Sequence, residues 1–227
     1  MLITGANGFV GFHLVNEALE AGFSVHAGVR KNSDINHPKN LNIQYSFLDY
    51  LDSLKEDFES KKYDFIVHAA GITKATDYIT YERINADYTW NIAKAAKSIN
   101  PQKIVFISSL AALGPAKYGL QNVLLADADP KPVTDYGKSK LLAEQYLKEF
   151  SELNWIILRP TAVYGPREKD LLLIIKTINK DKVSELVAEN WHCSIEKAQN
   201  EISFSPQFNL EKGMKNTIEW YKINKWI

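Results

Sequence analysis

The stretch Thr4-Gly5-Ala6-Asn7-Gly8-Phe9-Val10-Gly11 decides the fold of this chain, because three glycines fall between an apolar run and an amphipathic segment. Residues 1–4 have the composition of a short β-strand, and residues 9–21 carry apolar side chains at helical spacing. Gly5 permits a tight turn, Gly8 lets a phosphate approach the backbone, and Gly11 lets the helix pack closely on the sheet. The stretch therefore predicts a strand, a turn and a helix whose N-terminus binds the pyrophosphate of a dinucleotide.

The rest of the chain alternates between apolar runs and amphipathic stretches, which indicates an α/β fold. Continuous apolar runs are typical of parallel strands that helices cover on both faces. We expect a doubly wound parallel Rossmann sheet built from right-handed βαβ units, followed by a small, mostly helical C-terminal part. The predicted strands are residues 1–4, 23–29, 43–48, 65–69, 104–108 and 155–158, and the predicted helices are residues 9–21, 51–60, 81–99, 135–150, 181–190, 194–201 and 210–221.

Composition and charge exclude several classes of partner. The 227 residues include 27 basic and 27 acidic ones, so nothing in the charge favours nucleic acid or an acidic membrane. No apolar run approaches the ~20 residues that a transmembrane helix needs. The single cysteine, Cys193, is typical of a reducing compartment, and the five histidines show no spacing typical of a metal site. We expect a cytoplasmic protein that acts on a small molecule.

The end of the second predicted strand bears on which dinucleotide binds. An Asp or Glu there would bind the ribose 2′-hydroxyl of NAD, whereas an arginine accommodates the 2′-phosphate of NADP. This strand ends in Arg30, so we favour NADP and keep NAD as the alternative, since most arginines are simply solvated. Asp49, just past the third predicted strand, either accepts a hydrogen bond from the adenine amino group or caps a turn.

Tyr136 and Lys140 are the candidate reactive groups. They lie four residues apart at the start of a predicted helix, so their side chains share one face. A tyrosine with a pKa of about 10 is a poor acid or base at neutral pH, and a neighbouring ammonium lowers that pKa. The fifth predicted strand ends at Ser108-Ser109, on the carboxyl edge of the sheet where such folds bind ligands, and a serine hydroxyl there can orient a substrate oxygen.

Five segments together resemble the extended branch of the short-chain dehydrogenase/reductase family, which includes NAD-dependent epimerases and dehydratases. They are residues 4–11, His68-Ala69-Ala70-Gly71, Ser108-Ser109 with Gly114 downstream, residues 136–140, and residues 159–166. The segments occur in the family's order and at family-like spacing across residues 1 to about 175. The V-x-A-x-V-R pattern of residues 25–30 further resembles the NADP-using reductases of this family.

The resemblance implies a role for each matching residue. Tyr136 would be the catalytic acid/base, Lys140 its modulator and ribose anchor, and Ser109, five residues before Gly114, the hydroxyl that orients the substrate. Asn85 matches an asparagine that is usually structural. No residue is expected to bind a metal, and the residues expected to bind the dinucleotide are Gly5, Asn7, Gly8, Phe9, Val10, Gly11, Arg30, Asp49, Ala69, Ala70, Gly71, Lys140, Pro160 and Val163.

The main hypothesis for the activity is an NAD(P)-dependent oxidoreductase that transfers hydride to or from a carbonyl or alcohol. A nucleotide-sugar epimerase or dehydratase is the first alternative, and a non-catalytic NAD(P)-binding redox sensor is the second. The presence of Ser109, Tyr136 and Lys140 together favours an enzyme. Pairing through two long helices is common in the family, so a homodimer is a further hypothesis.

The resemblance also bears on domain organisation. Residues 1–175 would form the dinucleotide-binding domain with the catalytic residues, and residues 176–227 the helical remnant of a substrate-binding part. Extended members carry a larger substrate-binding section with a further strand pair, so we expect an internal stretch to be missing near residues 180–181. A naturally shortened enzyme is the alternative.

Overall fold

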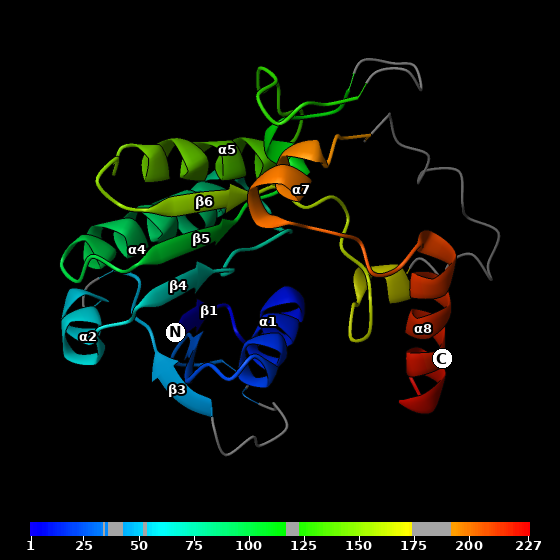
Figure 1. The fold of residues 1–227 in the computed structure, drawn as a ribbon, viewed down its shortest axis with the longest axis horizontal. Helices are drawn as coiled ribbons and strands as arrows, with labels where there is room; N and C mark the ends of the chain where they lie inside the picture. Colours follow the sequence, from blue (N-terminus) through cyan, green and yellow to red (C-terminus); the bar gives the residue numbers. More distant parts are fainter. Residues whose placement is uncertain (34, 36–42, 52–53, 117–122, 174–191) are drawn as a thin grey trace. The chain divides into compact units, whose positions relative to one another are not determined.

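The computed structural model describes residues 1–33, 35, 43–51, 54–116, 123–173 and 192–227 (Figure 1). The chain divides into two compact units, of which the first comprises Met1–Gly114 and Pro130–Thr161 and the second Pro115–Asp129 and Ala162–Ile227. The predicted boundary at residue 175, the predicted helix at residues 181–190 and the predicted gap near residues 180–181 lie outside the described residues.

The first unit is built on a six-stranded parallel sheet (Figure 1). Its strands lie in the order β3-β2-β1-β4-β5-β6, and every neighbouring pair is parallel. The chain starts at β1 in the middle and builds outward in both directions, so the predicted doubly wound Rossmann sheet is confirmed. The strands are β1 (Leu2–Thr4), β2 (Val25–Val29), β3 (Ile43–Phe47), β4 (Phe65–His68), β5 (Lys103–Ile107) and β6 (Trp155–Leu158).

Helices cover both faces of this sheet. Successive strand residues point to opposite faces, so Leu2 joins one core cluster and Ile3 the other. The Leu2 cluster includes side chains from α2, α4 and α5, among them the fully buried Phe58, and the Ile3 cluster includes Val15 from α1. The helices of this unit are α1 (Phe9–Glu20), α2 (Leu54–Lys61), α3 (Tyr78–Tyr81), the π-helix η1 (Glu82–Asp87), α4 (Tyr88–Lys97), the 3-10 helix η2 (Leu110–Ala112) and α5 (Asp135–Lys148).

The helix predicted at residues 81–99 differs in its start and in its geometry. It begins three residues earlier, because the Asp77 carboxylate accepts a hydrogen bond from the Thr80 N–H at 2.8 Å and caps the helix. Residues 82–87 then form a π-helix before α4 continues to Lys97. Apolar spacing predicts only a regular helix, so this wider turn could not be read from the sequence.

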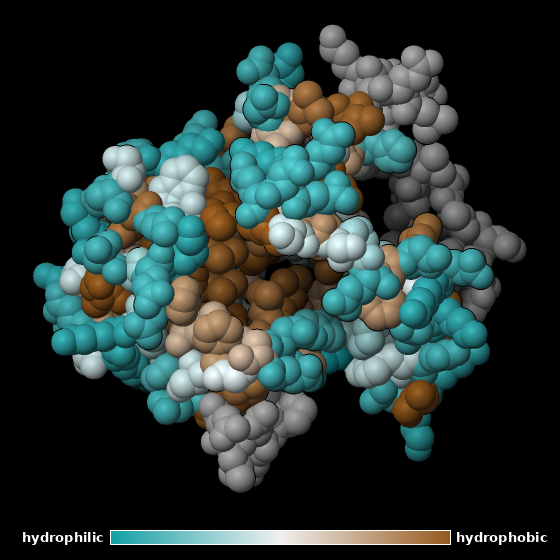
Figure 2. Space-filling model, viewed as in Figure 1, coloured by the Kyte–Doolittle hydropathy of each residue, from teal (hydrophilic) through white to brown (hydrophobic). Residues whose placement is uncertain are grey.

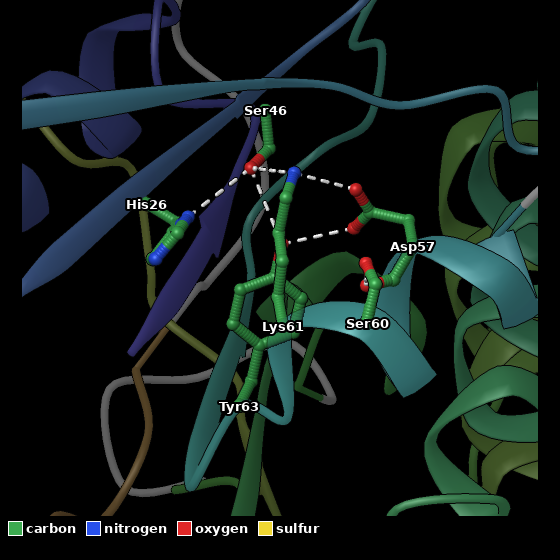
Figure 3. Close-up of polar contacts among 6 residues, drawn as sticks. All are labelled: His26, Ser46, Asp57, Ser60, Lys61 and Tyr63. Carbon is green, nitrogen blue, oxygen red and sulfur yellow. Dashed lines mark hydrogen bonds and ion pairs between the residues drawn. The ribbon is translucent and has the colours of Figure 1, made fainter.

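A cluster of polar side chains joins α2 to the neighbouring strands (Figure 3). The Ser46 hydroxyl on β3 lies 2.9 Å from the Lys61 Nζ and 3.2 Å from the Tyr63 hydroxyl. The Asp57 carboxylate pairs with Lys61 at 2.6 Å and accepts from Tyr63 at 2.9 Å. Burial, together with the charge of Lys61, lowers the pKa of His26 beside this cluster. These bonds fix α2 on the edge of the sheet.

The second unit contains α7 (Glu196–Ile202) and α8 (Leu210–Ile223). Tyr221 of α8 is buried, stacks on Trp226, and donates a hydrogen bond to the Glu168 carbonyl oxygen at 2.6 Å. No strand pairing was expected beyond residue 180, yet Cys193 forms an isolated parallel bridge with Leu124. Pairing between two short segments so far apart leaves no periodic pattern in the sequence.

Part of the surface over the sheet is apolar. Figure 2 shows apolar surface in the part of the view where β5 and β6 lie, and residues of these strands, such as Val105 and Ile156, are only half-buried. Among the described residues, no helix is both long enough and apolar enough to cross a membrane.

Candidate functional site

The glycine turn brings the ends of β1 and β4 together. Gly5 adopts a φ of +68°, in the left-handed region that favours glycine. A Cβ atom at Gly5 would lie 2.7 Å from the Cα atom of Ala70, so no side chain fits between the turn and the segment after β4. The structure therefore places Ala69 and Ala70 beside the glycine turn, and their part in a dinucleotide site, which the resemblance implies, stays a prediction.

The N-terminus of α1 has the features that a phosphate needs. Its N-cap residue is Gly8, which is exposed, and no side chain caps the helix. The first turn, which contains Phe9 and Val10, carries no acidic side chain that would repel an anion. Backbone N–H groups and the positive end of the helix dipole favour negative charge at such a terminus. These residues fit the pyrophosphate of a dinucleotide.

Gly11 holds α1 against the turn. A Cβ atom at Gly11 would lie 2.1 Å from the Gly5 carbonyl oxygen, whereas one at Gly8 would lie 3.2 Å from the same oxygen. We expect Gly11→Ala to lower the free energy of unfolding by about 3 kcal/mol, because backbone must move to make room. Gly8→Ala should unfold close to the wild type but lose dinucleotide affinity. Urea unfolding and a dinucleotide titration of tryptophan fluorescence test both, and a wild-type-like Gly11→Ala would contradict the close packing.

A chain of buried hydrogen bonds lies beneath the turn. Thr4 Oγ1 lies 2.7 Å from His68 Nδ1, and His68 Nε2 lies 3.0 Å from Thr89 Oγ1. The Thr89 hydroxyl donates to the Asn85 carbonyl oxygen, so His68 Nε2 must carry the proton and Nδ1 must accept from Thr4. Burial lowers the pKa of His68 to about 3, which keeps the ring neutral. No local pattern in the sequence predicts this link between β1, β4 and α4.

The start of α5 places Tyr136 beside Ser109. Thr134 caps the helix by accepting from the Gly137 N–H at 3.0 Å. A Cβ atom at Gly137 would lie 2.3 Å from the Ala111 carbonyl oxygen, so the helix packs directly on the segment after Ser109. The Ser109 hydroxyl hydrogen bonds to the Tyr136 phenol. This contact joins two of the three predicted catalytic residues. The neighbouring Ser108 is buried and instead donates a hydrogen bond to the Glu144 carboxylate.

The pKa of Tyr136 departs from the sequence-based expectation. Burial raises it, and the nearby Tyr81 also raises it, while the hydrogen bond from Ser109 acts in the opposite direction. The expectation that Lys140 lowers this pKa is therefore not met. The sequence shows that the two side chains share a helix face, but burial, which decides the direction, depends on the folded surroundings.

Lys140 lies in the interior, next to the segment that follows β4. Its Nζ donates to the Ile107 carbonyl oxygen at 2.9 Å and lies 4.8 Å from the centre of the Phe106 ring. A Cβ atom at Gly71 would lie 3.4 Å from this Nζ. Burial lowers the pKa of Lys140 to about 8. Lys140 thus lies beside the Ala69–Gly71 segment, which itself packs against the glycine turn.

Asn85 holds the same segment from the other side. Its Oδ1 accepts from the Ile72 N–H at 2.8 Å, and its Nδ2 donates to the Ile72 carbonyl oxygen and to Ser139 Oγ, both at 3.0 Å. Asn85 is fully buried in the π-helix η1. The amide therefore ties the segment after β4 to α5, which agrees with the structural role that the resemblance implies.

The remaining predicted residues lie further out. Arg30 is exposed at the end of β2. The Asp49 carboxylate accepts from the Leu51 N–H at 3.0 Å and so caps a turn, the second of its two predicted roles. The Pro160 carbonyl oxygen accepts from the Leu110 N–H at 2.9 Å, next to Ser109. Val163 belongs to the second unit, and its role stays a prediction.

The fold and this arrangement define a Rossmann-like enzyme with a tyrosine–lysine pair at the carboxyl edge of its sheet. The chain belongs to the NAD dependent epimerase/dehydratase family, whose model matches residues 1–192. The resemblance inferred from the five motifs is therefore confirmed.

Three comparisons show the range of similar proteins. The chain is 26% identical over 189 residues to the ceramide reductase of Caulobacter vibrioides, covering 82% of this chain and 53% of the relative. It is 29% identical over 179 residues to the UDP-glucose 4-epimerase of Vibrio cholerae, covering 74% and 53%. The solved structure of MoeE5 in complex with UDP-glucose and NAD aligns with a TM-score of 0.82 at 20% identity, over 99% of each chain, and shows the shared fold. The chain thus spans about half the length of the curated relatives that it matches.

Proposed function

We propose that the protein is an NAD-dependent nucleotide-sugar epimerase in which Ser109, Tyr136 and Lys140 act on the sugar. The observation that carries this proposal is the close packing of Gly137 on the Ala111 carbonyl oxygen, which brings Tyr136 beside Ser109 on the helix that also places Lys140 next to Gly71. The sequence pattern favoured a carbonyl reductase first and an epimerase second. We reverse that order because several similar proteins are UDP-glucose 4-epimerases.

The bound dinucleotide would be held by the glycine turn, the N-terminus of α1 and the Ala69–Gly71 segment, and its nicotinamide would supply hydride transfer. Tyr136 would take the proton of a sugar hydroxyl at its phenolic oxygen and later return it. Ser109 would orient the same sugar oxygen by hydrogen bonding. Lys140 would hold a positive charge on the helix face that it shares with Tyr136, beside the Ala69–Gly71 segment, where it could anchor the ribose of the dinucleotide.

NAD is the proposed cofactor. The solved structures of MoeE5 and of the Bacillus cereus UDP-glucuronic acid 4-epimerase contain NAD. The preference for NADP rests on Arg30, which is exposed, and on the V-x-A-x-V-R pattern of residues 25–30, and it stays a prediction. A reductase is the second candidate function, supported by the similarity to a ceramide reductase over 82% of this chain. The homodimer likewise stays a prediction.

Activity assays with two kinds of substrate separate these functions. We expect the purified protein to interconvert UDP-glucose and UDP-galactose, or another epimeric pair of nucleotide sugars, without net consumption of added NAD. A reductase would instead oxidise NADPH or NADH in proportion to a carbonyl substrate. Calorimetric titration with NAD and NADP tests the cofactor, with tighter binding of NAD expected. Stoichiometric NADPH oxidation with no epimerisation of any UDP- or GDP-sugar would overturn the proposal.

A further inference from the structure

We infer that Glu144 is a positioning residue that keeps the Lys140 side chain protonated, by holding a fixed negative charge one helical turn away from it. The inference rests on the proposed function, because it assigns Glu144 a part in the same reaction. Tyr136, Lys140 and Glu144 follow one another at four-residue intervals along α5, so they form a single row of side chains on that helix.

The Glu144 carboxylate is fully buried and accepts hydrogen bonds from side chains that follow the ends of two strands, β5 and β6. The Ser108 hydroxyl, after β5, donates to Oε1 at 2.5 Å. The Arg159 guanidinium, after β6, donates from Nε to Oε1 at 2.8 Å and from Nη2 to Oε2 at 2.5 Å. A buried carboxylate is tolerated only with such charge-assisted partners. Both oxygens are thus fixed in place relative to Lys140.

The other groups around Lys140 leave Glu144 as the source of the stabilising charge. The ring of Phe106 and the carbonyl oxygen of Ile107 face the ammonium from β5. His68, from β4, stays neutral because burial and the charge of Lys140 both lower its pKa. Tyr136 lies on the same helix, and burial raises its pKa, so it is uncharged near neutral pH.

Burial and Glu144 act on Lys140 in opposite directions. Burial disfavours the ammonium and lowers the pKa of Lys140 to about 8, whereas the Glu144 charge raises this pKa. Without that charge, the pKa would fall further and the side chain would lose its proton near neutral pH. A neutral amine would no longer place a positive charge on the helix face that it shares with Tyr136. The ion pair between Glu144 and Arg159 therefore holds α5 in place and also fixes the position of the negative charge that acts on Lys140.

A purely structural role makes a different prediction from an electrostatic one. Glu144 also joins α5 to the ends of β5 and β6, so its loss could lower stability without touching Lys140. The titration of Lys140 separates the two roles, because it reports charge and needs no catalytic activity. Nuclear magnetic resonance of ¹³C-lysine-labelled protein follows this titration, and the spectrum of Lys140→Met assigns the Lys140 signal.

We expect Glu144→Gln to move the midpoint of the Lys140 titration to lower pH. The proton concentration at the midpoint should rise about tenfold or more, since a nearby opposite charge has effects of this size. The double variant Glu144→Gln/Arg159→Gln removes both charges, avoids an unpaired arginine, and should show a shift in the same direction. Asp135→Asn, which removes an exposed carboxylate from the same helix, should leave the midpoint unchanged. The alkaline limb of the pH profile of kcat should move to lower pH together with the midpoint.

Two outcomes distinguish this inference from the proposed function. An unchanged Lys140 midpoint in folded Glu144→Gln and in the double variant overturns the role of Glu144, whatever the enzyme's substrate. A shifted midpoint in a protein that turns over no nucleotide sugar supports the electrostatic role and overturns the proposed epimerase.

Discussion

Replacing Tyr136 with phenylalanine should abolish epimerisation while leaving dinucleotide binding nearly unchanged. The substitution removes one hydroxyl, with which Ser109 interacts, and keeps the aromatic ring beside Tyr81. General acid–base catalysis contributes about 10²- to 10⁴-fold to enzymatic rates, so we expect a loss of at least that size in kcat. Dinucleotide binding should persist because the glycine turn and the α1 terminus are not altered.

Tyr81→Phe provides a matched control. The Tyr81 ring lies 6.3 Å from that of Tyr136, but its hydroxyl donates to the Thr73 carbonyl oxygen at 3.1 Å and has no predicted catalytic role. This variant should keep most of its activity. Initial rates with a nucleotide sugar and calorimetric titration with NAD would measure both effects. A Tyr136→Phe enzyme that turns over like the Tyr81→Phe control would rule out the acid/base role.

The fold and the cofactor half of the site could be predicted because their determinants are local. The turn between β1 and α1 can be recognised in the sequence because two of its positions require glycine. Position 5 adopts a left-handed φ, and position 11 has no room for a Cβ atom. The apolar runs of parallel strands are likewise visible without the structure. Their order in the sheet then follows from right-handed connections.

Much of the candidate site depends on contacts between distant segments, which no local pattern reveals. The hydrogen bonds of His68 to Thr4 and Thr89 join residues 64 and 21 positions apart. The ion pair of Glu144 with Arg159 joins α5 to the end of β6. The pKa of Tyr136 rises because the side chain is buried, and burial cannot be read from the spacing of Tyr136 and Lys140. The comparisons support an epimerase better than the reductase that the sequence pattern favoured, because the motifs that can be recognised in the sequence position a cofactor and not a substrate.

Replacing Lys140 with methionine should stabilise the fold and abolish activity together. Burial lowers the pKa of Lys140 from its ordinary value of 10.5 to about 8, so the folded state disfavours the ammonium by about 3 kcal/mol at pH 7. Methionine fills a similar volume without a charge, but it gives up the hydrogen bond to the Ile107 carbonyl oxygen, worth about 1 kcal/mol. We therefore expect the free energy of unfolding at pH 7 to rise by about 2 kcal/mol, as active sites commonly sacrifice stability for function.

The pH dependence of this gain identifies its cause. The cost of the buried ammonium is complete below pH 8, where both folded and unfolded chains bind the proton, and it disappears as the pH rises to 10.5. Urea unfolding should thus show a large difference between Lys140→Met and wild type at pH 7 and a much smaller one at pH 10. Lys138→Met, on the exposed face of α5 in a surface pair with Asp135, should change stability by less than about 0.5 kcal/mol at either pH. If Lys140→Met were instead destabilising at pH 7, the ammonium would contribute more through its bonds than it loses by burial, and Lys140 would be a structural residue as much as a catalytic one.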